Sequence, residues 1–316
     1  MVKQAATFRR RRLPRNGQQW KKLGAVYLLM LPALLLIVIY EYIPMGGGLL
    51  IAFKDFRITR GILGSDWCGF RNFEMLFTSP FFSMVMKNTI VISLYKLVFG
   101  FPAPIILAIM LNEVRSSKVK RVFQTAYYLP HFISWVVIGN LLFAFFAPQS
   151  GMLSGVFQSL GITFNPLMDS NVFQGFLAAT DIWKEIGWSS IIYLASITSI
   201  DSALYEAAAI DGANRRQTFF HIVLPLIVPI GGVIAILCAI NSLKVFDIVK
   251  TMTEGGPYYA TDVIGTFVYR QAFSSEMGMP RLGYASAAAI LFGITVIVIG
   301  IVLNVAKAKL NSKSQI

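Results

Sequence analysis

The sequence is poor in the residues that most enzyme and nucleotide-binding sites require. Only 14% of its 316 residues are charged, and it holds two histidines and two cysteines. It contains no Gly-Lys dipeptide, which excludes a Walker A loop for nucleotide phosphates. His131 and His221 lie in different segments, so neither a histidine-based triad nor a histidine-rich metal site is expected. Cys68 and Cys238 are far apart and make no disulfide framework.

Long apolar runs are abundant instead. Hydrophobic residues make up 56% of the chain and the mean hydropathy is +0.64, which is typical of an integral membrane protein. A bilayer core about 30 Å thick needs about 20 helical residues to cross it. Six stretches qualify: 23–43, 87–111, 124–147, 173–199, 222–247 and 283–306. The sequence therefore predicts an all-α, polytopic membrane protein with six transmembrane helices.

Local patterns also predict the fate of the first apolar run and the bounds of the membrane domain. The first apolar run is longer than a signal-peptide core and no small-residue cleavage site follows it, so we expect it to persist as a membrane span. An interfacial segment is expected near Pro80–Met86. The domain organisation is a basic N-terminal segment (1–22), a transmembrane domain (23–306) and a tail (307–316).

Basic residues give the orientation. The net charge is +13, yet the cations flank apolar spans, which indicates membrane topology and not a nucleic-acid partner. Seventeen of the 28 lysines and arginines lie in 1–22, 112–121, 200–221 and 307–316, and seven lie in the three loops on the opposite side. Because basic loops stay in the cytoplasm, we expect both termini and the loop 200–221 to be cytoplasmic.

The cytoplasmic loop has an unusual composition. Asp201 can cap a short helix over 202–210, and Asp211-Gly212 then ends it, with glycine in the left-handed conformation. An amphipathic segment over 214–224 follows before Pro225 admits the next span. Two interpretations are open from composition alone: a docking element for a partner, or an amphipathic loop that lies on the membrane.

The spacing of this loop resembles a known motif. Glu206-Ala207-Ala208, a glycine six residues after the glutamate, and Ile222-x-Leu224-Pro225 resemble the EAA motif of the integral-membrane permeases of bacterial ABC importers. The segments DWCGFRNF (66–73) and TEGGPYYATDVIGTFVYRQAF (253–273) look like permeases of the carbohydrate-uptake branch, of maltose or multiple-sugar type. The resemblance covers most of the chain.

The resemblance implies a function and a set of partners. The chain would be a multi-pass inner-membrane subunit that forms part of a carbohydrate pathway and needs no cofactor of its own. Partners would be a second permease, expected to be a different chain, two ATPase subunits that hold ATP and Mg²⁺, and an extracytoplasmic solute-binding protein that docks near 253–273. The implied ATPase-coupling residues are Glu206, Ala207, Ala208, Asp211, Gly212, Leu224 and Pro225.

Polar residues inside two spans form the second candidate site. In the fourth span Asp181, Lys184, Glu185 and Trp188 share one helix face, and in the fifth span Asn241 and Ser242 are polar. Either these residues line a substrate cavity or they satisfy one another in packing. In maltose-type permeases the corresponding two helices line the sugar cavity. Lys184 then suggests an acidic oligosaccharide, such as an alginate or pectin oligomer, unless the neighbouring carboxylates cancel its charge.

A rival function comes from a different class. A secondary transporter or channel would use Lys184 and Asp181 to relay protons or ions. Such transporters often carry internal repeats, and none is visible here. That function would also leave the cytoplasmic loop without a role.

Overall fold

The computed structural model describes residues 17–147, 151–161, 165–243, 245–252, 259–274 and 280–313. It is almost entirely helical, which confirms the predicted fold class. Within the described residues the only sheet is an antiparallel pair, β1 (Lys54–Asp55) and β2 (Asp66–Trp67), in which Lys54 lies opposite Trp67.

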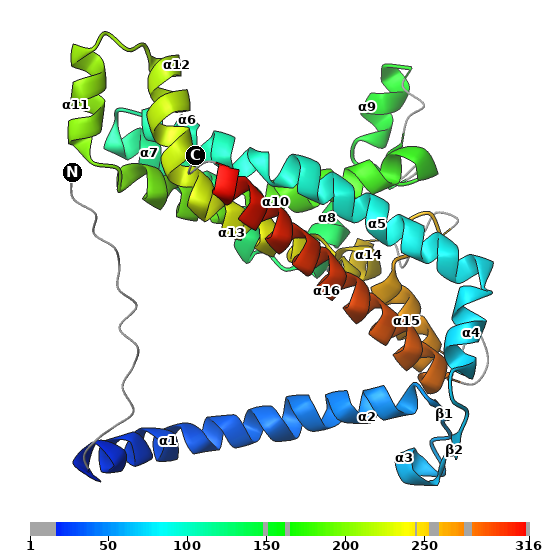
Figure 1. The fold of residues 1–316 in the computed structure, drawn as a ribbon. Helices are drawn as coiled ribbons and strands as arrows, with labels where there is room; N and C mark the ends of the chain where they lie inside the picture. Colours follow the sequence, from blue (N-terminus) through cyan, green and yellow to red (C-terminus); the bar gives the residue numbers. More distant parts are fainter. Residues whose placement is uncertain are drawn as a thin grey trace.

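The N-terminal helix lies apart from the remaining helices (Figure 1). It consists of α1 (Gly17–Ile37), a π-helical turn (Val38–Tyr42) and α2 (Ile43–Ile51). Its most apolar window has no buried residues, so its apolar side chains face outward all round. Only its C-terminal end meets the bundle, where α2 contacts α16 (Leu282–Lys313).

The remaining helices form an elongated bundle. Its long members are α5 (Pro80–Gly100), continued by α6 (Pro102–Glu113), together with α10 (Ser170–Thr198), α13 (Leu224–Ser242) and α16. Shorter helices complete it: α3 (Gly61–Gly64), α4 (Arg71–Phe77), α7 (Ser117–Tyr128), α8 (Trp135–Phe146), α9 (Ser154–Ser159), α14 (Phe246–Met252) and α15 (Ile264–Phe273). The loop between α10 and α13 contains α11 (Ser202–Ile210), α12 (Arg215–Thr218) and a π-helical turn (Phe219–Val223).

Three apolar clusters follow one another along the bundle. The first joins α4, α5, α15 and α16 around Leu76 and Phe267. The second joins α5, α10 and α14 around Ile92 and Phe173. The third joins α6, α10 and α13 around Leu107 and Tyr193, close to the α11–α12 loop. Each of the central helices α5–α6 and α10 therefore contributes to more than one cluster.

The predicted spans are reproduced unequally. Among the described residues, three helices are long and apolar enough to cross a membrane: Gly24–Ile51, Pro80–Glu113 and Leu282–Val305. A bent pair would make a fourth, and α10 carries three charged side chains in its central part. The count of six spans therefore stays a prediction. The helix α16 also continues through Lys313, so most of the predicted tail is helical.

One local expectation was wrong. The stretch 124–147 is not one straight helix, because the chain bends by 99° between Phe132 and Trp135. Pro130 lies in the 3₁₀ turn before the bend (Leu129–Phe132), and the hydroxyl of Ser134 accepts from Val137 N to start α8. The residues of the predicted interfacial segment form the first two turns of α5, which the hydroxyl of Ser79 caps by accepting from Phe82 N, and their position at the membrane interface stays a prediction.

The end of α7 crosses α10 at a glycine. A Cβ atom added to Gly187 would lie 2.0 Å from the carbonyl oxygen of Tyr127 and 2.4 Å from its carbonyl carbon. No side chain fits that space, so the crossing requires glycine at this position. Gly175 on the same helix has no atom within 4 Å of a built Cβ.

Replacing Gly187 by alanine should therefore loosen the bundle. We expect Gly187→Ala to cost about 1–3 kcal/mol of stability, because overpacking must push the two backbones apart. The temperature at which half of the purified protein is lost from a size-exclusion peak measures the effect. Gly175→Ala is the matched control and should be neutral or slightly stabilising, since alanine favours helix. Equal behaviour of the two variants would contradict the close crossing.

Candidate functional site

A cavity with charged and polar side chains in its wall lies between α5–α6, α10 and α13. Its volume is about 410 Å³, within the range of about 300–1,000 Å³ that small-molecule sites occupy. The charged and polar lining residues are Lys96, Asp181, Glu185, Ser189, Asn241 and Ser242; Trp188 and Cys238 also line it. Among the described residues, no three His, Cys, Asp or Glu side chains converge as a metal site would require.

The cavity interrupts the apolar interior of the bundle. Along α10 it occupies 181–192, between Leu177 of the second apolar cluster and Tyr193 of the third. Along α5–α6 it occupies 96–104, between Ile92 and Leu107 of the same two clusters. The polar side chains of the cavity wall therefore lie between two apolar clusters of the bundle.

The structure brings together five of the six residues predicted for a substrate pathway. Asp181, Glu185 and Trp188 from α10 line the cavity with Asn241 and Ser242 from α13. The sixth residue, Lys184, does not line it, and only 5% of this lysine is exposed. Sequence reasoning gave Lys96 of α5 little weight, although a lysine in the middle of an apolar span is a signal in itself.

The charges in and beside the cavity are paired with one another. Lys96 Nζ lies 3.1 Å from Asp181 Oδ2, and both side chains are mostly buried. Lys184 Nζ donates to the backbone oxygen of His131 at 2.7 Å and lies 3.1 Å from Glu185 Oε1. His131 Nδ1 lies 2.7 Å from the other oxygen of Glu185. Internal pairing, one of the two alternatives, is therefore present together with the cavity.

An aromatic surface lies beside these charges. The rings of His131 and Trp188 are stacked with centroids 4.6 Å apart and an interplanar angle of 2°. Trp188 remains 47% exposed and lines the cavity, so His131 covers one side of the indole only. The close crossing at Gly187 makes this possible, because it brings the turn that follows α7 against α10.

The loop between α10 and α13 forms the second candidate site (Figure 1). Asp201 caps α11, since its Oδ1 accepts from Ala203 N at 3.0 Å. At the other end Ala213 N donates to Ala208 O and Gly212 N donates to Ala209 O, which is a Schellman motif. The φ angle of Gly212 is +74°. The predicted helix, its cap and its glycine turn are thus confirmed as structure.

The predicted coupling residues differ in exposure. Glu206, Ala207, Asp211 and Gly212 are exposed, whereas Ala208 is only 8% exposed and faces its own chain. Leu224 is half-buried and begins α13, and Pro225 occupies its first turn. Sequence reasoning did not single out Ile210, which is 86% exposed at the end of α11. An aliphatic residue directly before the Asp-Gly turn was the available signal.

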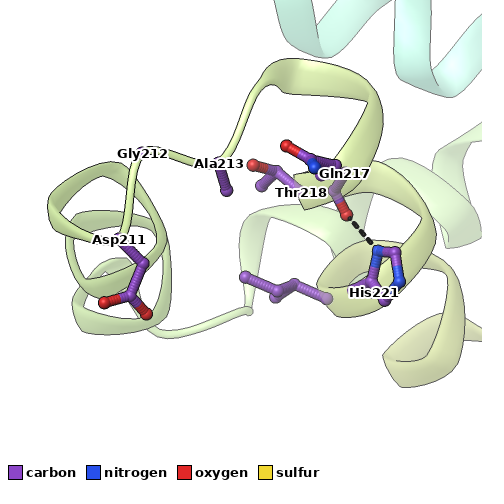
Figure 2. Close-up of a pocket in the computed structure, with 7 residues that line it drawn as sticks. Asp211, Gly212, Ala213, Gln217, Thr218 and His221 are labelled. Atoms are coloured by element: carbon purple, nitrogen blue, oxygen red, sulfur yellow. Dashed lines mark hydrogen bonds between the residues drawn. The ribbon is translucent and has the colours of Figure 1, made fainter.

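A small hollow separates α11 from the start of the following helix. Figure 2 shows Asp211, Gly212 and Ala213 on one side, and Gln217, Thr218 and His221 on the other. The hollow measures about 320 Å³. His221 Nδ1 donates to Gln217 O at 2.9 Å.

The loop is also tied to the bundle by charge. Arg215 Nη1 lies 2.6 Å from Glu113 Oε2 at the end of α6, although both side chains are largely exposed. Tyr205 lines a neighbouring cavity with Glu113 and Arg215. Burial raises the pKa of Tyr205, and the negative charge of Glu113 adds to the rise.

The segment predicted to meet a solute-binding protein is partly described. Residues 253–258 lie outside the described residues. Asn88 Nδ2 donates to the backbone oxygens of Tyr259 and Asp262, and Gln174 Nε2 donates to Ala260 O. The φ angle of Tyr259 is +58°, which is uncommon for a residue with a side chain.

The carboxylate of Asp262 is fully buried beneath this segment. It accepts from Thr266 Oγ1 and pairs with Arg270. Burial raises the pKa of Asp262, and the Thr266 hydroxyl and the Arg270 charge oppose the rise. The segment before α15 is therefore held to α5 by Asn88 and to α10 by Gln174, and Thr266 and Arg270 hold its carboxylate against α15.

Comparisons with known proteins agree on one family. Residues 100–315 match the family described as "Binding-protein-dependent transport system inner membrane component". The chain is 38% identical over 280 residues to Protein LplB of Bacillus subtilis (strain 168), covering 88% of this chain and 85% of that protein. It is 39% identical over 246 residues to the polygalacturonan/rhamnogalacturonan transport system permease protein YteP of the same organism, covering 77% of this chain and 76% of that protein.

A solved structure is similar in fold as well. It is a bacterial alginate ABC transporter in complex with alginate pentasaccharide-bound periplasmic protein. The TM-score is 0.82 at 34% identity, and the match covers 94% of this chain and 98% of the other. The sequence comparisons and the fold comparison therefore point to the same family over most of the chain.

The buried pair Lys96–Asp181 should contribute to stability only as a pair. We expect Lys96→Met to cost about 3–5 kcal/mol, because it leaves Asp181 unpaired, and the double variant Lys96→Met/Asp181→Leu to recover most of that loss. Thermal unfolding of the purified protein measures both. Arg60→Gln breaks the exposed pair with Asp66 and should cost at most about 1 kcal/mol. A double variant as unstable as Lys96→Met would contradict the pairing.

Proposed function

Because this chain belongs to the family of binding-protein-dependent transport system inner membrane components, we propose that it is a permease subunit of an ABC importer for carbohydrates. The observation that carries this proposal is the cavity with charged and polar side chains between the second and third apolar clusters. The α11–α12 loop lies beyond the third of these clusters. A pathway needs a polar site at membrane depth that is closed to free passage. A coupled pathway also needs an element that responds to an ATPase.

The proposed substrate is an oligosaccharide. Sugars expose C–H faces that pack on aromatic rings and hydroxyls that bond to amides, hydroxyls and charged groups. The cavity offers the indole of Trp188, the amide of Asn241 and the pair Lys96–Asp181. Relatives of this chain are named for polygalacturonan and alginate, which are acidic polysaccharides, and we extend that class to this chain.

The cation that supports an acidic substrate is not the one predicted. Lys184 is buried, and its ammonium group is bound to His131 O and beside Glu185. Lys96 lies in the cavity wall instead, 3.1 Å from Asp181. A uronate carboxylate can compete with Asp181 for this ammonium group, which a neutral sugar cannot do.

The chain would work within a larger assembly. We propose a second permease beside it, two ATPase subunits that hold ATP and Mg²⁺, and an extracytoplasmic solute-binding protein. The α11–α12 loop would insert into the ATPase, with Glu206, Ala207 and the exposed Ile210 in contact. Both termini and this loop would lie in the cytoplasm, as the basic residues indicate.

The test of this function uses the reconstituted transporter. ATPase activity should be stimulated by the binding protein loaded with acidic oligosaccharides, and less by the same protein offered neutral ones. The ATPase subunit should also co-purify with this chain in detergent. A chain that purifies without any ATPase and conducts ions in liposomes would be a channel or a secondary transporter instead.

Trp188 should matter for transport and not for assembly. We expect Trp188→Ala to lower the ratio of stimulated to basal ATPase activity about two- to tenfold, because one aromatic contact with the substrate is lost. Basal activity and the yield of intact complex should survive. Trp183→Ala, on the same helix but outside the cavity wall, is the control and should leave the ratio unchanged. A lower yield with a normal ratio would assign Trp188 to packing.

Gly212 should matter for coupling through its backbone conformation. At φ +74°, Gly212→Val is strained, so we expect normal amounts in the membrane, weak ATPase association and at least tenfold slower uptake. Gly212→Asn should retain most of the uptake, because asparagine tolerates the left-handed region. Uptake assays and co-purification on both variants measure this. Normal uptake by Gly212→Val would remove the loop from the coupling mechanism.

A further inference from the structure

A second large cavity lies at the opposite end of the bundle from the α11–α12 loop. Its volume is about 920 Å³, and it lies between β1, α4 and the start of α16, which gather at one corner in Figure 1. Its wall contains four cations: Lys54, Arg57, Arg71 and Arg281. Among the described residues of the wall, Asp55 is the only acidic one. Seven lysines and arginines lie in the three loops that the sequence places opposite the cytoplasmic side, and four of these seven line this one cavity.

Two of these cations already have protein partners. Lys54 Nζ donates to Ile62 O at 2.7 Å and to Ser65 O at 3.2 Å, and Arg57 lies 3.8 Å from Asp55. Arg71 and Arg281 differ from them. Within the described part of the chain, neither guanidinium group has an ion pair or a side-chain hydrogen bond. Two unmatched positive charges from segments far apart in sequence face the same space.

The cavity lies where three membrane-crossing helices end. The helix Gly24–Ile51 ends beside it, Pro80–Glu113 begins just after α4, and Leu282–Val305 begins at its wall. These are the three helices that are long and apolar enough to span a bilayer by themselves among the described residues. Lipid phosphates lie just beyond the ends of such helices, because the hydrocarbon core is about 30 Å thick.

The surroundings also fit the membrane surface. Trp67 and Phe70 are more than half exposed in the same segment, and exposed aromatic rings are typical of the headgroup region. The cavity is rigidly built. Asn72 Nδ2 donates to Ala52 O and Lys54 O, and a Cβ on Gly283 would lie 2.6 Å from Lys54 O. The start of α16 is thereby fixed against the end of α2.

We propose that this cavity binds the phosphate headgroup of an anionic phospholipid, with Arg71 and Arg281 as its principal donors. A guanidinium group offers a planar fork of N–H donors that suits phosphate oxygens, and two of them match a headgroup with net negative charge. A zwitterionic headgroup carries a compensating cation and is the weaker ligand. The site is separate from the substrate cavity, so its test does not depend on which sugar is transported.

The experiment measures lipid retention by the intact transporter. The complex is purified in detergent with equal amounts of dioleoyl phosphatidylglycerol and dioleoyl phosphatidylcholine, and bound lipids are counted by native mass spectrometry. Wild-type complex should retain phosphatidylglycerol preferentially. Arg71→Gln/Arg281→Gln should lower the affinity for it roughly thirty-fold, because each cation near an anionic lipid surface contributes about fivefold in binding and two cations are removed.

The matched control removes two cations from the same side of the chain. Arg60→Gln/Lys87→Gln changes the net charge equally, and neither residue lines the cavity. This control should retain phosphatidylglycerol as the wild type does. Arg71→Lys/Arg281→Lys keeps the charge but loses the planar fork, so its retention should be intermediate even if the glutamine variant proves unstable.

Three results would overturn the proposal. Equal retention by the glutamine variant and the control would show that the cavity does not hold the lipid. Competition by inorganic phosphate at concentrations similar to those of phosphatidylglycerol would indicate a free-anion site. If Arg71→Gln/Arg281→Gln lost affinity for the solute-binding protein but retained lipid as the wild type does, the cavity would be a protein docking site.

Discussion

The approach of two backbones at Gly187 determines how the central helix is surrounded. The carbonyl group of Tyr127 occupies the space that any side chain at this position would need. Because α7 ends so close to α10, the turn that follows it reaches the polar face of α10. His131 then stacks on Trp188, and its backbone oxygen receives the ammonium group of Lys184. The contacts of His131 with Trp188 and Lys184 thus depend on the absence of a side chain at Gly187.

The α5–α6 helix connects the two candidate sites. Lys96 forms part of the cavity wall, and Glu113 at the end of the same 34-residue helix pairs with Arg215 of the loop. The loop is therefore in contact with the helix that carries Lys96, so a displacement of the loop would act on that helix. The ion pair is exposed and contributes little energy by itself. The Arg215–Glu113 pair instead identifies the place where the loop contacts the bundle.

Local features of the fold were predictable from sequence. Asp201 as a cap and Gly212 as a turn depend on short-range hydrogen bonds and one φ angle, which neighbouring residues determine. The shared face of Asp181, Glu185 and Trp188 follows from helical periodicity alone. The bend before Trp135 was also within reach, because Pro130 and Ser134 are both signals for a break.

Partners across the fold were not predictable. Periodicity places Lys184 on a face, but its partner is a backbone oxygen 53 residues earlier in the chain. Asp181 likewise pairs with Lys96 of another helix and not with its near neighbour Lys184. Arg71 and Arg281 line one cavity only because α4 and α16 meet. Such pairs depend on how helices cross, and a single sequence holds no direct record of it.

The exposed first helix has a consequence for how the molecule holds together. The apolar window of Gly24–Ile51 is not buried by the rest of the chain, and the helix is attached at its C-terminal end, where α2 contacts α16 and where Ala52 and Lys54 accept from Asn72. The bundle is stabilised by packing within the chain, whereas this helix gains its stability from whatever surrounds it. It therefore resembles an arm hinged at one end. A change in its direction would act on its contacts with α16 and on the first apolar cluster, which Ala52 joins, whereas the second and third clusters contain no residue of this helix.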